Sequence, residues 1–190
     1  MELGAIDGIR FTTTKFFEDH VGFSQGVLTE PVPISFKKLL KNRPNCECFN
    51  YVIHSDKKQV EFLINKKQYA VGCINNKDSK KVIRDFQKSD KHKDHSIKKI
   101  LPAERLDVVL QKTKLQYLDL WVLDVEGSEL QCLKSMDWSI PIGLVVVEYN
   151  HNGNSIHNIM LDNGFTLIDM KGRDCFYFNF RYFRKKFFSI

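Results

Sequence analysis

The chain has 190 residues, 43% of them hydrophobic, which is enough for one α/β domain with a sizeable core but not for two full domains. No apolar run approaches the roughly 18 to 20 residues that cross a bilayer, and no basic stretch precedes an apolar one at the N-terminus, so we expect a cytoplasmic protein without membrane insertion. The net charge of +6 is concentrated in residues 77–99 and 181–190, whereas the remainder is net acidic, so overall basicity is weak support for nucleic-acid binding.

Apolar runs alternate with helical patterns along the chain, which indicates βαβ units and a mainly parallel sheet within a single domain, 1–190. Strands are expected over 1–3, 26–29, 46–54, 60–64, 118–123, 142–147, 165–169 and 175–180, with a further strand end at 101. Helices are expected over 12–21, 33–41 and 154–161, in the second half of 101–110, and from Ser128, where Gln131 three residues later forms a capping-box pattern. The last two strands flank 170–174 and predict an antiparallel hairpin at one edge of the sheet.

Three features of the sequence need a separate interpretation. Residues 75–99 carry charges without a useful hydrophobic face, so we expect a loop or a loosely held helix there. The first strand has only two residues after the initiator Met before Gly4, which fits either an unusually short strand or a domain excised from a longer protein. The five cysteines lack paired CxxC spacing, so reduced and mostly buried thiols are expected.

Acidic residues accompany glycines at the ends of the first two strands. Gly4 and Gly8 allow the backbone to approach a ligand closely, while Glu2 and Asp7 supply hydrogen-bond acceptors. Glu30 follows about 20 residues later at the end of the second strand, a position from which a carboxylate holds ribose hydroxyls in nucleotide-binding sheets. The glycine spacing departs from GxGxxG, and acidic residues suit a cationic nucleoside better than a dinucleotide.

Two later strands also end in polar residues. Asp124 and Glu126 follow the strand at 118–123, and Glu148, Asn150 and His151 follow the strand at 142–147. Because open α/β sheets bind ligands beyond the carboxyl ends of their strands, we expect these side chains at the same rim.

Taken together, these segments resemble the FkbM-type S-adenosylmethionine-dependent methyltransferases. The resemblance covers nearly the whole chain and rests on ELGAIDG at 2–8, TEP at 29–31, NRP at 42–44, LD at 106–107, LDVEGSEL at 123–130 and VEYN at 147–150. It implies a Rossmann-like class I methyltransferase fold, with a seven-stranded, mainly parallel sheet and an antiparallel C-terminal strand. It also implies O-methylation, with sugar hydroxyls of glycans or glycoconjugates as a common acceptor class. One departure is TTT at 12–14, where relatives often carry Ser-Asn-Thr.

The resemblance also implies roles for residues that match its motifs. Gly4, Ala5, Asp7 and Gly8 would line the methionine end of S-adenosylmethionine, with Glu2 beneath them and Glu30 on the ribose. The turn formed by His54, Ser55 and Asp56 would contact adenine. Asp124 and Glu126 would lie beside the sulfonium and the incoming hydroxyl.

Methyl transfer to a sugar hydroxyl needs a base, or a cation that lowers the pKa of the hydroxyl. The candidate bases are Asp124, Glu126, Glu148 and His151. A divalent cation held by Asp124, Glu148 and Asn150 is the less favoured alternative, by analogy with Mg²⁺-dependent O-methyltransferases.

Aromatic side chains near the rim suggest acceptor contacts from Phe11 and Tyr149, since sugar faces stack on such rings. A rival interpretation is an RNA methyltransferase or RNA-binding module that uses the basic segment 77–99 and the interleaved aromatic and basic residues at 182–188. The acidic rim favours a carbohydrate acceptor over nucleic acid.

Overall fold

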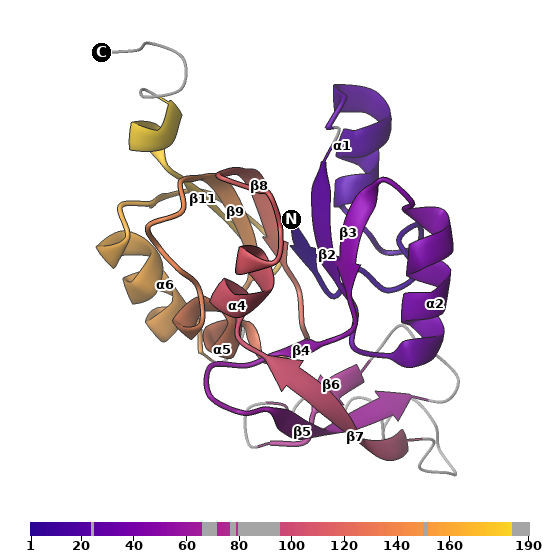
Figure 1. Cartoon of the computed structure of the whole chain (residues 1–190). Helices are drawn as coiled ribbons and strands as arrows, with labels where there is room; N and C mark the ends of the chain where they lie inside the picture. Colours follow the sequence, from indigo (N-terminus) through magenta and orange to yellow (C-terminus); the bar gives the residue numbers. More distant parts are fainter. Residues whose placement is uncertain (24, 66–71, 77–78, 80–95, 150–151, 184–190) are drawn as a thin grey trace.

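The computed structural model describes residues 1–23, 25–65, 72–76, 79, 96–149 and 152–183 (Figure 1). Its main layer is a seven-stranded sheet with the strand order β10-β11-β9-β8-β1-β2-β3. These strands are β1 (Glu2–Leu3), β2 (Gly26–Thr29), β3 (Cys46–Phe49), β8 (Leu118–Leu123), β9 (Ile142–Glu148), β10 (Thr166–Lys171) and β11 (Asp174–Phe178).

Pairing in this sheet is parallel from β3 through β2, β1 and β8 to β9, whereas β11 pairs antiparallel with both β9 and β10. The predicted mixed α/β fold with a seven-stranded, mostly parallel sheet and an antiparallel strand near the C-terminus is therefore confirmed. The strands β8 and β9 are apolar almost throughout and largely buried, as expected where both faces of a sheet are covered. The strand β1 is two residues long, and the Met1 amino group donates to the Leu120 carbonyl oxygen at 2.7 Å.

Five helices with both ends in the described part of the chain flank the sheet. In Figure 1, α1 (Thr14–Val21) and α2 (Pro33–Asn42) lie beside the β1–β3 half, and α4 (Leu106–Gln111), α5 (Glu129–Lys134) and α6 (Gly153–Asp162) lie beside the β8–β11 half. The principal core packs Trp121 and Leu123 of β8 against Leu133 of α5 and Met160 of α6. No helix among the described residues is long and apolar enough to cross a membrane.

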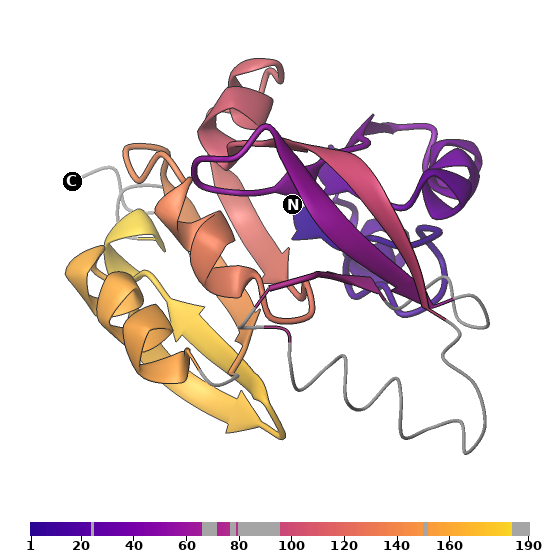
Figure 2. The same cartoon turned by 90° about the horizontal axis from the view of Figure 1, so that it is seen from below.

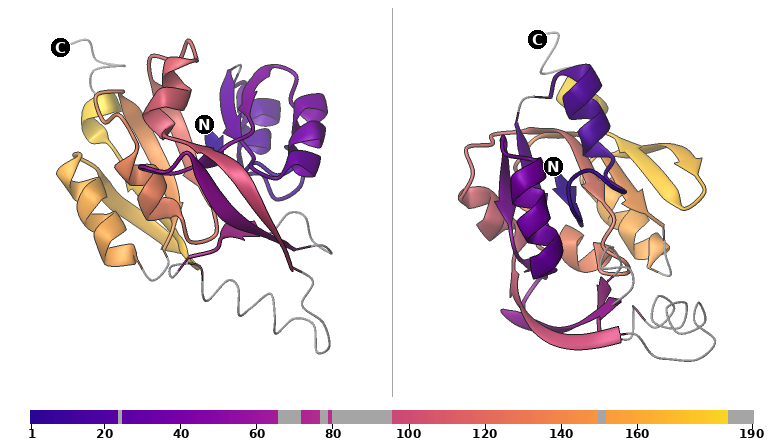
Figure 3. Two further views of the ribbon diagram at one scale, coloured as in Figure 1. Left: turned by 60° about the horizontal axis from the view of Figure 1, so that its bottom comes forward. Right: turned by 90° about the vertical axis from the view of Figure 1, so that its right-hand side faces the viewer.

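A second, four-stranded sheet has the order β4-β7-β5-β6 and lies across one end of the seven-stranded sheet (Figures 2 and 3). Its strands are β4 (Val52–Ile53), β5 (Gln59–Asn65), β6 (Gly72–Ile74) and β7 (Ser96–Glu104). The apolar side of this small sheet packs Val60, Phe62 and Leu101 together with Val32.

The small sheet corrects two predictions. The single strand expected over 46–54 is wrong, because the chain turns at Asn50, whose side-chain amide donates to the carbonyl oxygens of Glu30 and Pro31, and it then enters the second sheet as β4. The loop or helix expected over 75–99 is wrong at its end, where 96–99 pair with β5 as part of β7. Residues 77–78 and 80–95 lie outside the described part of the chain.

The capping box predicted at Ser128 and Gln131 is also wrong. The Ser128 side chain makes no cap hydrogen bond, and the Gln131 side chain accepts one from the Ser55 hydroxyl at 2.7 Å. The turn before α5 is closed instead by Glu129, whose Oε1 accepts the Gly127 N–H at 3.0 Å. A carboxylate bonds backbone N–H groups more strongly than a neutral hydroxyl does, which explains why Glu129 takes this role.

Candidate active site

A cavity of about 680 Å³ lies between the carboxyl ends of the parallel strands and the small sheet. Four segments line it: the turn after β1, the end of β2 with the start of α2, the strands of the small sheet, and the turn after β8. This location matches the general rule that open α/β sheets bind ligands beyond the carboxyl ends of their strands.

The turn after β1 lies against the end of β2. The N–H groups of Gly4 and Ala5 both donate to the Thr29 carbonyl oxygen at 3.0 Å, and Gly4 has a φ of +85° that favours glycine. Gly4 and Asp7 line the cavity, whereas Ala5 is fully buried below it. Gly8 is also outside the lining, because it faces Leu39 and Arg43 closely enough that a side chain there would collide with both.

Glu2 lines the cavity and holds the start of α1. Its carboxylate accepts the hydroxyls of Thr12 and Thr14 and, at 3.0 Å, the N–H of Thr13. The three threonines, of which Thr12 and Thr13 depart from the family pattern, thus all bind one buried carboxylate. They also explain why α1 begins at Thr14 and not at Thr12 as predicted.

Glu30 follows β2 and is 4% exposed. Its two carboxylate oxygens accept the N–H groups of Ile6 at 3.0 Å and Val32 at 2.8 Å, so this side chain joins the first two strand ends. Burial raises the pKa of Glu30 to about 8, although the two N–H groups favour the ionised form. Each oxygen retains a lone pair for a further donor, such as a ribose hydroxyl.

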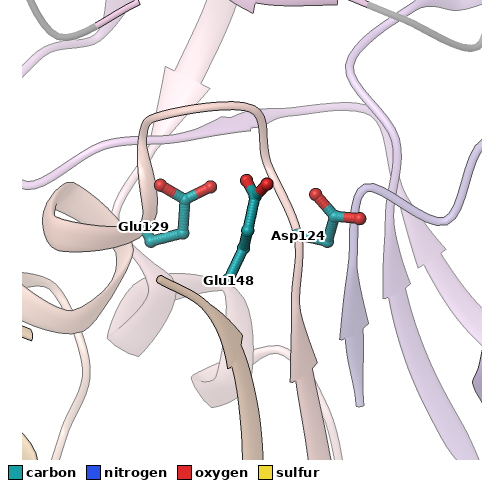
Figure 4. A group of neighbouring side chains, drawn as sticks. All are labelled: Asp124, Glu129 and Glu148. Atoms are coloured by element: carbon teal, nitrogen blue, oxygen red, sulfur yellow. The ribbon is translucent and has the colours of Figure 1, made fainter. Parts of the chain in front are cut away.

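Carboxylates also gather at the ends of β8 and β9 (Figure 4). Oxygen atoms of Asp124, Glu129 and Glu148 lie within 4.8 Å of one another, with Glu148 between the other two. Asp124 is solvent-exposed through the cavity, yet partial burial, together with Glu148 and Asp174, raises its pKa to about 6. Burial, with Asp124 and Glu148 nearby, raises the pKa of Glu126 to about 7.

Only part of this acidic group faces the cavity. Asp124 and Glu126 line it, whereas Glu148 does not and pairs with Arg173 at 2.9 Å across the β9–β11 ladder. Three neighbouring carboxylates offer the oxygen ligands that hard cations prefer. However, Glu129 already accepts backbone N–H groups of Val125 and Gly127, and Glu148 already has its arginine. Glu129 and Glu148 therefore each have protein partners at one carboxylate oxygen.

Several predicted site residues do not line the cavity or are not among the described residues. His54, Ser55 and Asp56 do not line the cavity: His54 faces Asp56 at 2.9 Å, and Ser55 faces Gln131. The segment immediately before them, Tyr51, Val52 and Ile53, lines it instead. The candidate base His151 and the candidate ligand Asn150 lie outside the described residues.

Of the two aromatic residues predicted to contact the acceptor, only one lines the cavity. Phe11 lines the cavity, is 84% exposed and has a left-handed φ of +57°, whereas Tyr149 does not line it and donates its hydroxyl to Asn154 at 3.1 Å.

Three kinds of residue in or beside the cavity were not predicted from the sequence. Phe62 and Ile74 of the small sheet form an apolar wall of the cavity. In the sequence they show only the alternation of a strand, which does not indicate a binding site. The cations Arg10 and Lys38 lie within predicted turn and helix segments and carried no motif signal. Glu129 was present in the 123–130 motif but was interpreted as part of a helix start.

The fold and the cavity define a mixed α/β protein with an acidic cavity at the carboxyl edge of its main sheet. The family model described as Methyltransferase FkbM domain matches residues 2–167, so the chain belongs to the FkbM methyltransferase family, as the sequence motifs indicated. No curated protein and no solved structure matches the chain.

Proposed function

We propose that this methyltransferase is an S-adenosylmethionine-dependent O-methyltransferase with a Rossmann-like fold, located in the cytoplasm, that methylates a sugar hydroxyl of a glycan or glycoconjugate. The observation that carries the proposal is the presence of Glu30 and Asp124 in one cavity, with Gly4 beside both strand ends. A carboxylate after the second strand suits ribose hydroxyls, and an acidic group after β8 suits a sulfonium.

The cavity lining has separate regions that match the parts of this donor. Glu30 would accept the ribose hydroxyls, and Gly4 and Asp7 would lie along the methionine end. The apolar side chains of Pro31, Ile53 and Phe62, rather than the polar turn at 54–56, would cover the adenine. An apolar wall with a few placed polar groups is the usual construction of a cofactor site.

The bound donor would supply an electrophilic methyl carbon on a cationic sulfur. Asp124 or Glu126 would take the proton of the acceptor hydroxyl. The hydroxyl oxygen would bond to the methyl carbon as the carbon–sulfur bond breaks, leaving S-adenosylhomocysteine. The pKa values of about 6 and 7 suit a base that works near neutral pH. The sulfonium charge favours the ionised carboxylate before transfer, and its loss on transfer raises the pKa of the base, which helps the base keep the proton.

The acceptor assignment rests on the acidity of the cavity and on Phe11. Neutral hydroxyls, unlike phosphates, approach Asp124 and Glu126 without repulsion, and the exposed Phe11 ring at the mouth offers a face for a sugar to stack on.

The test incubates the protein with S-adenosylmethionine labelled in its methyl group and a panel of methyl glycosides, free sugars and RNA. The proposal predicts labelled methyl ethers of a sugar and no labelled RNA. Labelled RNA, together with RNA binding that weakens steeply as salt rises, would instead support the rival function.

A further inference from the structure

Two cationic side chains line this otherwise acidic cavity. Arg10 comes from the segment after the glycine turn, and Lys38 comes from α2. Neither side chain has a hydrogen bond or ion pair with another residue in the described part of the chain. In contrast, Glu2 and Glu30, which line the same cavity, already accept protein donors at both oxygens.

Arg10 is held at a defined turn. The backbone N–H groups of Ile9 and Arg10 donate to Asp7 Oδ1 at 3.0 and 2.8 Å, and the next residue, Phe11, has a φ of +57°. Such an Asx turn fixes the backbone on both sides of Arg10 without engaging its guanidinium. Lys38 lies instead on the second turn of α2, beyond Ser35, which also lines the cavity.

We propose that Arg10 binds the α-carboxylate of the methyl donor, an inference that rests on the proposed function. The methionine end of the donor would lie along the glycine turn, where the neighbouring charged residues that line the cavity, Glu2 and Asp7, are both acidic. A carboxylate placed there needs a cation, and Arg10 is the cation that this turn supplies. A guanidinium also matches a carboxylate through two parallel hydrogen bonds, which an ammonium does not provide.

The test compares two ligands that differ only in this carboxylate: S-adenosylmethionine and decarboxylated S-adenosylmethionine. Each is titrated calorimetrically into the unmodified protein, Arg10→Met and Lys38→Met. Since a hydrogen-bonded charged pair contributes about tenfold to hundredfold in affinity, the unmodified protein should prefer S-adenosylmethionine by that factor. Arg10→Met should reduce the preference to within about threefold. Lys38→Met removes an equal charge from the same cavity and should keep the original preference.

The possible results separate the role of Arg10 from the proposed function itself. An unmodified protein that binds both ligands equally, or an Arg10→Met variant that keeps the full preference, overturns the role of Arg10. Loss of the preference in Lys38→Met alone would place the carboxylate at α2 and also overturn it. Binding of neither ligand to the unmodified protein would instead contradict the proposed function itself. Arg10 is exposed, so thermal unfolding should show that its variant remains folded.

Discussion

Gly4 packs directly against the main-chain carbonyl of Asp124, so close that a methyl group on the Gly4 Cα would overlap that oxygen. This contact joins the glycine turn after β1 to the acidic turn after β8, the two segments that we assign to the methionine end and to the base. The close approach of these two turns at the cavity therefore depends on the absence of a side chain at Gly4.

Gly4→Ala should abolish donor binding and destabilise the fold, because the new methyl group meets a backbone oxygen and the φ of +85° disfavours a side chain. The matched control is Gly22→Ala at the end of α1, where φ is also positive but nothing lies nearby. That variant should cost only about 1 kcal/mol and keep donor binding. Equal effects on calorimetric binding in the two variants would contradict a role for the Gly4 contact.

Asp124→Asn should lower turnover by about 10² to 10⁴, the usual contribution of a general base, while leaving donor binding partly intact. The change preserves the shape of the side chain but removes the proton acceptor. The control Asp162→Asn alters an exposed residue of α6, remote from the cavity lining, and should have full activity. Steady-state kinetics at saturating donor checks this; full turnover in Asp124→Asn would contradict Asp124 as the base and leave Glu126 as the remaining candidate of the two.

Donor affinity should increase as pH rises from about 6 to 9. Burial raises the pKa of Glu30 to about 8 in the free protein, while ribose hydroxyls and the sulfonium favour its ionised form, so binding at lower pH must expel a proton. Glu30→Gln should weaken binding and flatten the profile above pH 7. The slope between pH 6 and 7 should persist, since Asp124 and Glu126 also have raised pKa values. Calorimetric titrations across this range measure both effects, and an unchanged profile in Glu30→Gln would show that Glu30 does not contact the donor.

Arg43→Ala should destabilise the protein by about 2 to 3 kcal/mol, because it removes a buried side chain together with its ion pair and hydrogen bonds. Arg43 is 2% exposed, pairs with Glu18 of α1 at 2.6 Å, and donates to the Gly8 carbonyl oxygen at 3.4 Å. Its loss leaves Glu18 paired with Lys15, at 3.4 Å, and removes one hydrogen bond between α2 and the glycine turn. Denaturant unfolding checks this against Lys41→Ala, an exposed position of α2 that should cost less than about 0.5 kcal/mol.

The sequence predicted the main sheet well because its strands are bounded by local signals. The strands at 26–29 and 118–123 were placed at their observed limits, since each is an apolar run with turn residues on both sides. The small sheet was missed because its assignment depends on long-range pairing, 59–65 with 96–102, and on the bend that Asn50 stabilises. Periodicity shows that a segment is a strand but not which sheet it joins.

The candidate site also contains residues that could be predicted from the sequence and residues that could not. Glu30, Asp124 and Glu126 were predicted together because the carboxyl ends of parallel strands share one edge, a rule that needs no side-chain geometry. The adenine contact expected at 54–56 depended on how far the third strand continues, and the chain leaves the main sheet before that point. Arg10 was not predicted because a single arginine in a turn has no pattern of its own.

In the proposed function, the methyl donor occupies the cavity between Glu30 and Asp124. A crystal structure of the protein grown with saturating S-adenosylhomocysteine tests it most directly. We expect ribose hydroxyls on the Glu30 carboxylate, the adenine against Ile53 and Phe62, and the sulfur beside Asp124. Density for the ligand at another place on the molecule, or an empty cavity at a concentration that saturates binding in solution, would contradict it.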